Sequence, residues 1–91
     1  MSTITQVAVS FRCVCAARVD VPSAVGSIAL GSFAVRSNAG RTEHEGKVTI
    51  LAGSADEATT AFRAAAEEWA ANSGTSCEVT IFGAHPVAAT I

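Results

Sequence analysis

The sequence predicts an α+β fold: a two-layer sandwich with a mainly antiparallel sheet, the order β-β-β-α-β, and one helix packed on one face. Three observations support this prediction. Apolar residues occupy alternate positions over residues 7–15, 47–52 and 77–82, which is the period of half-buried strands. Residues 54–72 carry apolar side chains at helical spacing. No helical pattern separates the first strands, so antiparallel pairing is expected.

Length and composition are typical of one small domain over residues 1–91. Hydrophobic residues make up 49% of the chain and charged residues 15%, which excludes a disordered protein. The net charge of −2 argues against a general polyanion binder. No membrane span and no secretory signal are expected. Three cysteines, an odd number, favour reduced thiols and a cytoplasmic location.

The first half of the chain predicts two strands and a loop. The inward positions of the first strand are Val7, Val9, Phe11, Cys13 and Cys15, and the strand ends before Pro22. A second strand is expected over residues 28–37, bent near Gly31, although two glycines make this segment less regular. The polar residues 38–46 predict a hairpin loop.

The second half predicts a strand, a helix and a last strand. Val48 and Ile50 face inward in "KVTILA". Ser54 and Glu57 predict a capping box at the start of the helix. The apolar stripe of this helix is Ala58, Phe62, Ala65 and Trp69, and the helix ends near Gly74. "TSCEVTIFG" then forms a strand with Cys77, Val79 and Ile81 inward.

Cys13 and Cys15 raise the question of metal or redox chemistry, since they lie one residue apart. All three cysteines fall at inward positions of strands, where a thiol behaves as a small hydrophobe. A structural zinc site usually has Cys pairs two to four residues apart and a fourth ligand. We therefore expect core thiols, with no metal and no cofactor.

An enzyme is not expected. His44 has acidic neighbours that favour its charged form, but no nucleophile elbow accompanies it. The carboxylate pairs Glu43/Glu45 and Glu67/Glu68 are expected on a solvated surface rather than in a cleft. The two glycine-rich phosphate-binding motifs, G-x-x-x-x-G-K-[ST] and G-x-G-x-x-G, are both absent from the sequence.

The sheet face turned away from the helix offers a binding surface. Its expected residues are Arg12, Arg36, Lys47, Thr49, Glu78, Thr80 and Phe82. A basic face with an aromatic ring suits single-stranded nucleic acid, but stacking platforms usually have two or three rings and this one has a single Phe. Nucleic-acid binding through Arg12, Arg36 and Lys47 is therefore kept as an alternative hypothesis. A second alternative is that this face is simply covered by solvent and binds nothing.

Binding to another protein is the favoured function. Five Arg against one Lys suit interface contacts, because a guanidinium pairs bidentately with carboxylates. The charged hairpin and the uncovered sheet face are the surfaces available. The predicted partner-binding residues are Arg12, Arg36, Arg41, Glu43, His44, Glu45 and Lys47.

The layout of residues 47–83 resembles that of some small phage-encoded proteins, anti-CRISPR inhibitors among them. The resemblance is carried by the capped, Ala-rich helix "SADEATTAFRAAAEEWA" followed by the strand "CEVTIFG". It implies a non-enzymatic inhibitor that docks on a host effector complex, and it assigns no functional residue. A phage structural or self-assembling protein is a further alternative.

The C-terminal residues predict self-association. "PVAATI" is apolar, and Val87 and Ile91 suit an added edge strand. Burying this tail and one sheet edge between two copies favours a homodimer. The alternative is that the tail folds back along its own sheet.

Overall fold

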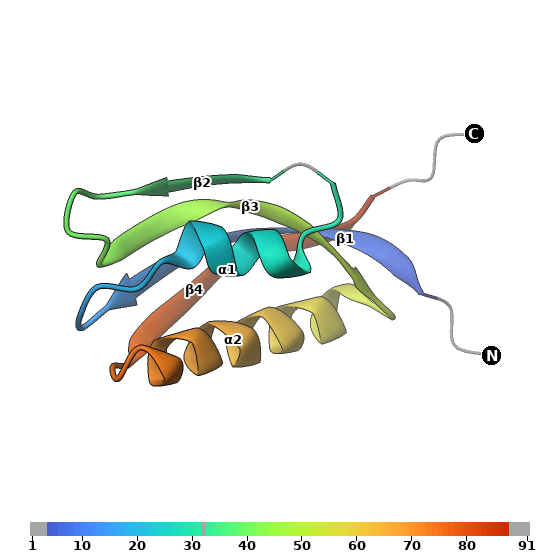
Figure 1. The fold of residues 1–91 in the computed structure, drawn as a ribbon. Helices are drawn as coiled ribbons and strands as arrows, with labels where there is room; N and C mark the ends of the chain where they lie inside the picture. Colours follow the sequence, from blue (N-terminus) through green and yellow to red (C-terminus); the bar gives the residue numbers. More distant parts are fainter. Residues whose placement is uncertain (1–3, 32, 88–91) are drawn as a thin grey trace.

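The computed structural model describes residues 4–31 and 33–87. The elements follow the order β1 (Thr5–Cys15), α1 (Val21–Ile28), β2 (Ala34–Ser37), β3 (Glu43–Ala52), α2 (Ala55–Asn72) and β4 (Cys77–Pro86). Figure 1 shows the four strands as one layer and the two helices as a second layer on one face of the sheet. The predicted α+β sandwich is thus confirmed, with one more helix than the sequence pattern indicated.

The sheet is antiparallel throughout, in the order β2-β3-β1-β4. β1 lies in the centre because its alternation places a continuous apolar face, from Val7 to Cys15, against the helices. Its register with β4 shifts between Ser10 and Phe11, so β4 has one extra residue there. This β-bulge changes the phase of β4, and Ala84 instead of Gly83 follows Ile81 on the inner face.

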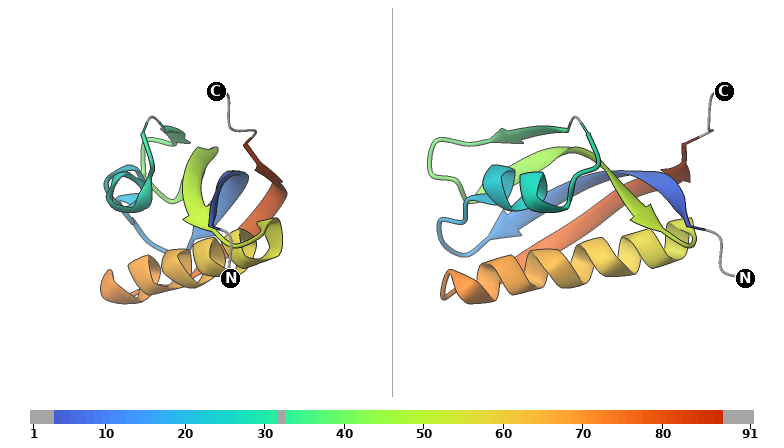
Figure 2. Two further views of the ribbon diagram at one scale, coloured as in Figure 1. Left: turned by 90° about the vertical axis from the view of Figure 1, so that its right-hand side faces the viewer. Right: turned by 45° about the vertical axis from the view of Figure 1, so that its right-hand side comes forward.

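Helix α2 packs beneath β1 and β4, as the second views of the ribbon show (Figure 2). Its start has the first bond of the predicted capping box, from the Glu57 amide to Ser54 Oγ, but the Glu57 carboxylate accepts from the Gly53 amide instead of the amide of Ser54. Gly74 adopts a positive φ of 74° just after the helix. The buried stripe is Ala58, Phe62, Ala66 and Ala70, in which the next residue along the helix replaces each of the predicted Ala65 and Trp69. Trp69 still packs against the core from its edge.

The strand predicted over residues 28–37 is shorter in the structure, and helix α1, which was not predicted, precedes it. Pro22 stands in the first turn of α1, and Asp20 caps it by accepting hydrogen bonds from the Ser23 amide and hydroxyl. Val21 and Val25, four residues apart, are buried in the core shared with α2. Gly31, with a φ of 81°, lies between α1 and β2, so the strand is reduced to Ala34–Ser37.

The β2–β3 hairpin is tighter than the predicted loop of residues 38–46. β3 already begins at Glu43, and the turn is held by Asn38, whose Oδ1 accepts from the Thr42 and Glu43 amides. Gly46 lets β2 approach closely: a Cβ there would collide with the Ala34 carbonyl oxygen and would lie 2.8 Å from the Val35 Cα.

The Cys77–Pro86 strand is longer than its sequence pattern indicated. The Val87 amide donates to the Gln6 carbonyl oxygen at 2.8 Å, so the start of the predicted tail continues along β1 of its own sheet. Residues 88–91, including Ile91, lie outside the described residues. In the part of the chain that the structure describes, neither helix is long and apolar enough to cross a membrane.

Candidate functional site

The sheet surface opposite the helices, here called the open face, carries a cross-strand row of charges. Arg36 on β2 is paired with Glu45 on β3, and Glu45 is paired with Arg12 on β1. Thr80 on β4 completes the row beside Arg12. The row exists because antiparallel partners point to the same face, and it is exposed because both helices cover the other face. The open face comprises Arg12, Arg36, Glu43, Glu45, Lys47, Glu78, Thr80 and Phe82.

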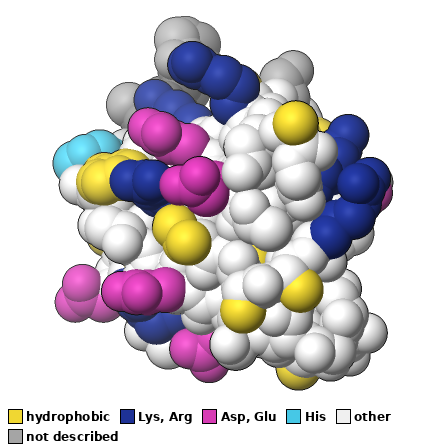
Figure 3. Space-filling view, turned by 90° about the vertical axis from the view of Figure 1, so that its left-hand side faces the viewer, with side chains coloured by type: hydrophobic (Ala, Val, Ile, Leu, Met, Phe, Trp, Pro, Cys, Tyr) yellow, Lys and Arg dark blue, Asp and Glu magenta, His cyan; other side chains and the backbone are white. Residues whose placement is uncertain are grey.

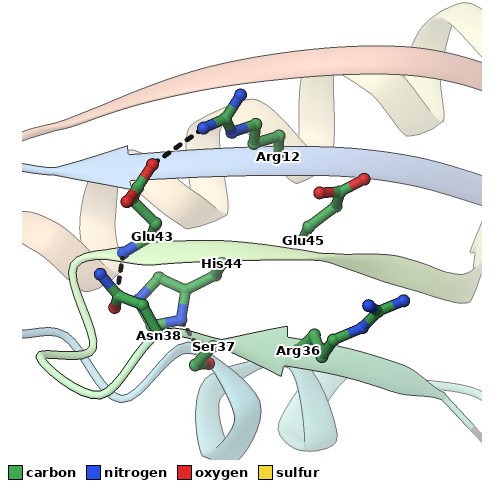
Figure 4. Close-up of a pocket in the computed structure, with 7 residues that line it drawn as sticks. All are labelled: Arg12, Arg36, Ser37, Asn38, Glu43, His44 and Glu45. Atoms are coloured by element: carbon green, nitrogen blue, oxygen red, sulfur yellow. Dashed lines mark hydrogen bonds and ion pairs between the residues drawn. The ribbon is translucent and has the colours of Figure 1, made fainter.

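One ion pair orders this surface. Arg12 Nη2 lies 2.8 Å from Glu43 Oε1, and both side chains are about half exposed, at 48% and 50%. A pair this exposed contributes about 0.2–1 kcal/mol, so it orients the two side chains more than it stabilises the fold. Within the described residues Arg36 forms no ion pair, although Glu45 is its cross-strand neighbour. Figure 4 shows Arg12 directed to Glu43, with Glu45 between Arg12 and Arg36 along the sheet.

Two shallow hollows adjoin along the open face and share Arg36 and Glu45. The first, of about 270 Å³, lies between the Arg12–Glu43 pair and the end of β2. The second, of about 580 Å³, extends toward Phe82, Lys47 and Ser10. Phe82 is 61% exposed at the β4 bulge. The surface therefore combines a polar hollow with an exposed aromatic ring at its border.

The charges of the open face are balanced. Its three cationic side chains are Arg12, Arg36 and Lys47, and its three carboxylates are Glu43, Glu45 and Glu78. Figure 3 views the molecule from the end that bears the hairpin turn of residues 38–42 and shows acidic and basic side chains next to one another. The described side chains of the open face therefore carry no excess of either charge.

His44 corrects the expectation of a charged histidine at the surface. Its side chain points inward and is 1% exposed. Nε2 lies 2.9 Å from the Arg41 carbonyl oxygen, which only accepts, so Nε2 carries the proton; Nδ1 then accepts from Ser37 Oγ at 2.7 Å. Burial lowers the pKa of His44, and this effect exceeds the opposing one of the hydrogen bond to the Arg41 carbonyl oxygen. The neutral imidazole is thus a structural link between β3, β2 and the turn.

Arg41 also lies apart from the open face. It has a φ of 55°, unusual for a residue other than glycine, and its guanidinium is 3.6 Å from Asp20 at the start of α1.

Of the seven predicted partner-binding residues, the structure brings five together on one surface: Arg12, Arg36, Glu43, Glu45 and Lys47. The sequence pattern placed Phe82 on this face, but Phe82 was not included among the partner-binding residues. Its position next to the inward-facing Ile81 was the signal that its ring points outward.

The buried His44 predicts a pH dependence of stability. Because its folded pKa lies below the ordinary value of 6.5, the unfolded chain binds more protons in this range. The contribution of His44 to the free energy of unfolding should therefore be constant above pH 6.5. The free energy of unfolding should fall as the pH drops from 6.5 toward the pKa of His44 in the folded protein. Denaturant titrations between about pH 7.5 and 5 measure this slope.

Two variants separate this effect from other titrations. His85→Gln, at an exposed position of β4, should keep the slope, and His44→Gln should remove it from a lower starting stability. The hydrogen bonds from Ser23 lower the pKa of Asp20 from 3.8, so its contribution is lost only at more acidic pH. A slope that persists in His44→Gln would contradict the assignment.

Neither a metal-binding group nor a similar known protein indicates the function of the chain. In residues 4–31 and 33–87, no group of three or more His, Cys, Asp or Glu side chains is placed to hold a metal ion. Cys13 and Cys15 are buried, as predicted, while Cys77 is partly exposed. Comparisons of the chain with protein-family models, with curated proteins and with solved structures find no match. A functional proposal therefore depends on the open face.

Proposed function

We propose that this protein is a non-enzymatic protein-binding module whose docking surface is the open face. The observation that carries the proposal is the row Arg36–Glu45–Arg12, exposed across three strands beside the protruding Phe82. Arginine and aromatic side chains are the residue types that contribute most to protein interfaces. Strand pairing fixes the backbone of the row, so binding orders only its side chains and no backbone segment.

Charge distinguishes this function from nucleic-acid binding, the alternative hypothesis. A phosphate backbone selects an excess of positive charge, but the three cations of the open face stand among three carboxylates. Among the described residues that define the open face Phe82 is the single aromatic one, with Phe33 at the border of the larger hollow, whereas single-strand platforms usually stack two or three bases on the sheet itself. Both observations favour a protein partner.

The finer proposal is an inhibitor from a phage or other mobile element that docks on a host effector complex in the cytoplasm. Its support is the layout of α2 and β4, which resembles that of small phage-encoded inhibitors. The balanced face adds a physical argument, because complementary charges on a partner fix register and exclude wrong partners more than they raise affinity. A phage structural protein remains the second candidate.

The expected result is that binding is lost on mutation of the open face alone. Arg36→Glu places two carboxylates opposite each other and reverses the charge offered to the partner, while Phe82→Ala removes the exposed ring. Each should weaken capture of a discrete protein complex from host lysate at least about tenfold. Quantitative pull-down followed by titration with the purified complex measures this loss.

Glu68→Lys is the matched control, since it changes an exposed charge on α2, away from the open face. It should bind like the wild type. Retention of binding in Arg36→Glu and Phe82→Ala would disprove docking through the open face. Salt-sensitive binding to single-stranded DNA or RNA, lost in Arg36→Glu, would establish the nucleic-acid alternative instead.

Self-association stays a prediction. The apolar residues 86–91 and the sheet edges favour a homodimer with twofold symmetry. Size-exclusion chromatography with light scattering should give twice the chain mass, and deletion of residues 87–91 should give the monomer. A full-length monomer would contradict the homodimer, and a large closed or filamentous assembly would favour the structural-protein candidate.

A further inference from the structure

Two of the three thiols face each other at the end of the sheet where β1 ends and β4 begins. Cys15 on β1 and Cys77 on β4 are direct cross-strand partners. The Ala16 amide donates to the Ser76 carbonyl oxygen at 3.0 Å, one residue beyond each cysteine. This bond defines Cys15 and Cys77 as a non-hydrogen-bonded pair, the kind of pair whose side chains lie closest in an antiparallel sheet.

The backbone geometry of such a pair suits a disulfide. Its Cα atoms lie about 4.5 Å apart. A disulfide needs a Cα separation of roughly 4.4–6.8 Å and Cβ vectors that do not diverge. Both side chains point to the inner face, because they continue the inward phase of Cys13 and Val79. No rearrangement of β1 or β4 is therefore required to join the two sulfurs.

Cys13 does not have this relation to either thiol. Its direct partners are His44 on β3 and Val79 on β4. Cys15 is two residues along the same strand, where the rise alone separates the side chains by roughly 6.5 Å. Cys77 is its diagonal neighbour on β4, at about 7–8 Å. Cys13 is also fully buried, so it is closed to reagents.

Cys77 gives a reagent access to the pair. It is partly exposed, and its Sγ donates to the Ala66 carbonyl oxygen on α2 at 3.3 Å. Burial raises the pKa of Cys15 to about 11, and burial also raises the pKa of Cys77. Little thiolate is present near neutral pH, so oxidation is slow there and accelerates as the pH rises.

We propose that Cys15 and Cys77 are an oxidation site that a small-molecule disulfide converts into an intramolecular disulfide, leaving Cys13 reduced. In the first step the Cys77 thiolate attacks one sulfur of the oxidant, which forms a mixed disulfide and releases a thiolate that takes up the proton lost by Cys77. In the second step the Cys15 thiolate attacks the Cys77 sulfur and displaces the second thiol. Two protein thiols are oxidised, and one molecule of the oxidant is reduced to two thiols.

The bond would close the loop that contains α1, β2, β3 and α2. Joining residues 15 and 77 restricts the unfolded chain over about 60 residues, which corresponds to a rise in the thermal midpoint of about 10 °C or more. The protein would therefore have two stabilities, set by the thiol–disulfide balance around it. This property is independent of whether the open face binds a protein.

The test uses the full-length, reduced chain incubated with excess oxidised glutathione at about pH 7 and pH 8.5. We expect a single chain lighter by two hydrogen atoms, one alkylatable thiol in place of three, and a peptide map that joins Cys15 to Cys77 within that chain. Oxidation should be faster at the higher pH, and dithiothreitol should restore the original mass and midpoint. Cys13→Ser should behave like the wild type, while Cys15→Ser and Cys77→Ser should each fail to form an intramolecular bond.

Three results would overturn the proposal. The first is a disulfide that includes Cys13. The second is oxidation only between chains. The third is a native protein that stays fully reduced while the same protein oxidises in denaturant, which would show that the fold separates the two sulfurs. Each variant's fold is checked by circular dichroism before oxidation, so a folding defect is distinguished from a missing bond.

Discussion

Phe62→Ala is expected to lower the free energy of unfolding by about 3–5 kcal/mol, the largest effect of any single substitution considered for this protein. Phe62 is fully buried in the centre of α2. Its ring lies 4.4 Å from that of Phe11 on β1 and 5.8 Å from that of Trp69 in an edge-on arrangement, measured between ring centroids. Truncation removes the contact that joins the helix to the central strand and leaves a cavity between the two layers.

The size of this loss is large for a chain of 91 residues, since a small domain has a total stability of roughly 5–13 kcal/mol. Urea unfolding followed by tryptophan fluorescence measures it through Trp69, the one tryptophan of the chain. Phe82→Ala is the matched control: the chemical change is identical, but the ring is exposed and the loss should stay below about 1 kcal/mol. Equal losses in the two variants would mean that Phe62 is not a core residue.

Gly46→Ala is expected to detach β2 from β3 and to cost about 2–3 kcal/mol. The added Cβ would meet the Ala34 carbonyl oxygen and the Val35 Cα, and both are backbone atoms that no rotamer change can move away. The strand itself must shift, which breaks its pairing with β3 and the Ser37–His44 hydrogen bond.

Hydrogen exchange reports this detachment directly. The Asn38 amide, which donates to the Glu43 carbonyl oxygen, should lose protection, while the amides between β1 and β4 keep theirs. Gly83→Ala serves as the control, because its Cβ would meet only the flexible side chain of His85 at 3.0 Å. A stable Gly46→Ala variant with intact Asn38 protection would refute the close approach of β2.

Patterns of long, regular elements made most of the fold predictable from the sequence. The period of two over residues 7–15 identified β1 and its inner face, and Ser54 with Glu57 identified the start of α2. Helix α1 was missed because it is only eight residues long, and a helix of that length depends on packing rather than on its own propensity. Asp20 and Pro22 were the available signals, with Val21 and Val25 spaced for one buried face.

The outward-facing residues of the candidate site were predictable wherever the alternation of inward and outward side chains along a strand is regular. Val48 and Ile50 define the inner face of β3, so Lys47 and Glu45 had to point outward. The same phase places His44 inward, and the expectation of a charged surface histidine was wrong because its acidic sequence neighbours point to the opposite face. The bulge beside Phe82 was beyond the pattern, because one extra residue leaves no mark in composition or periodicity until the partner strand is known.

The hydrogen bond from Arg63 to Val79 bears on aggregation. Val79 and its partner Cys13 belong to the same non-hydrogen-bonded series as Cys15 and Cys77, so the Val79 carbonyl oxygen points away from β1. Arg63 reaches from α2 and donates to this oxygen at 2.7 Å. A foreign strand that approached the outer side of β4 would have to displace a guanidinium from a carbonyl group and pass a bulge. The outer edge of β4 is thereby blocked at Val79 against the pairing of a foreign strand, whereas, in the part of the chain that the structure describes, the four residues of β2 leave residues 48–52 of β3 without a strand partner on the opposite side.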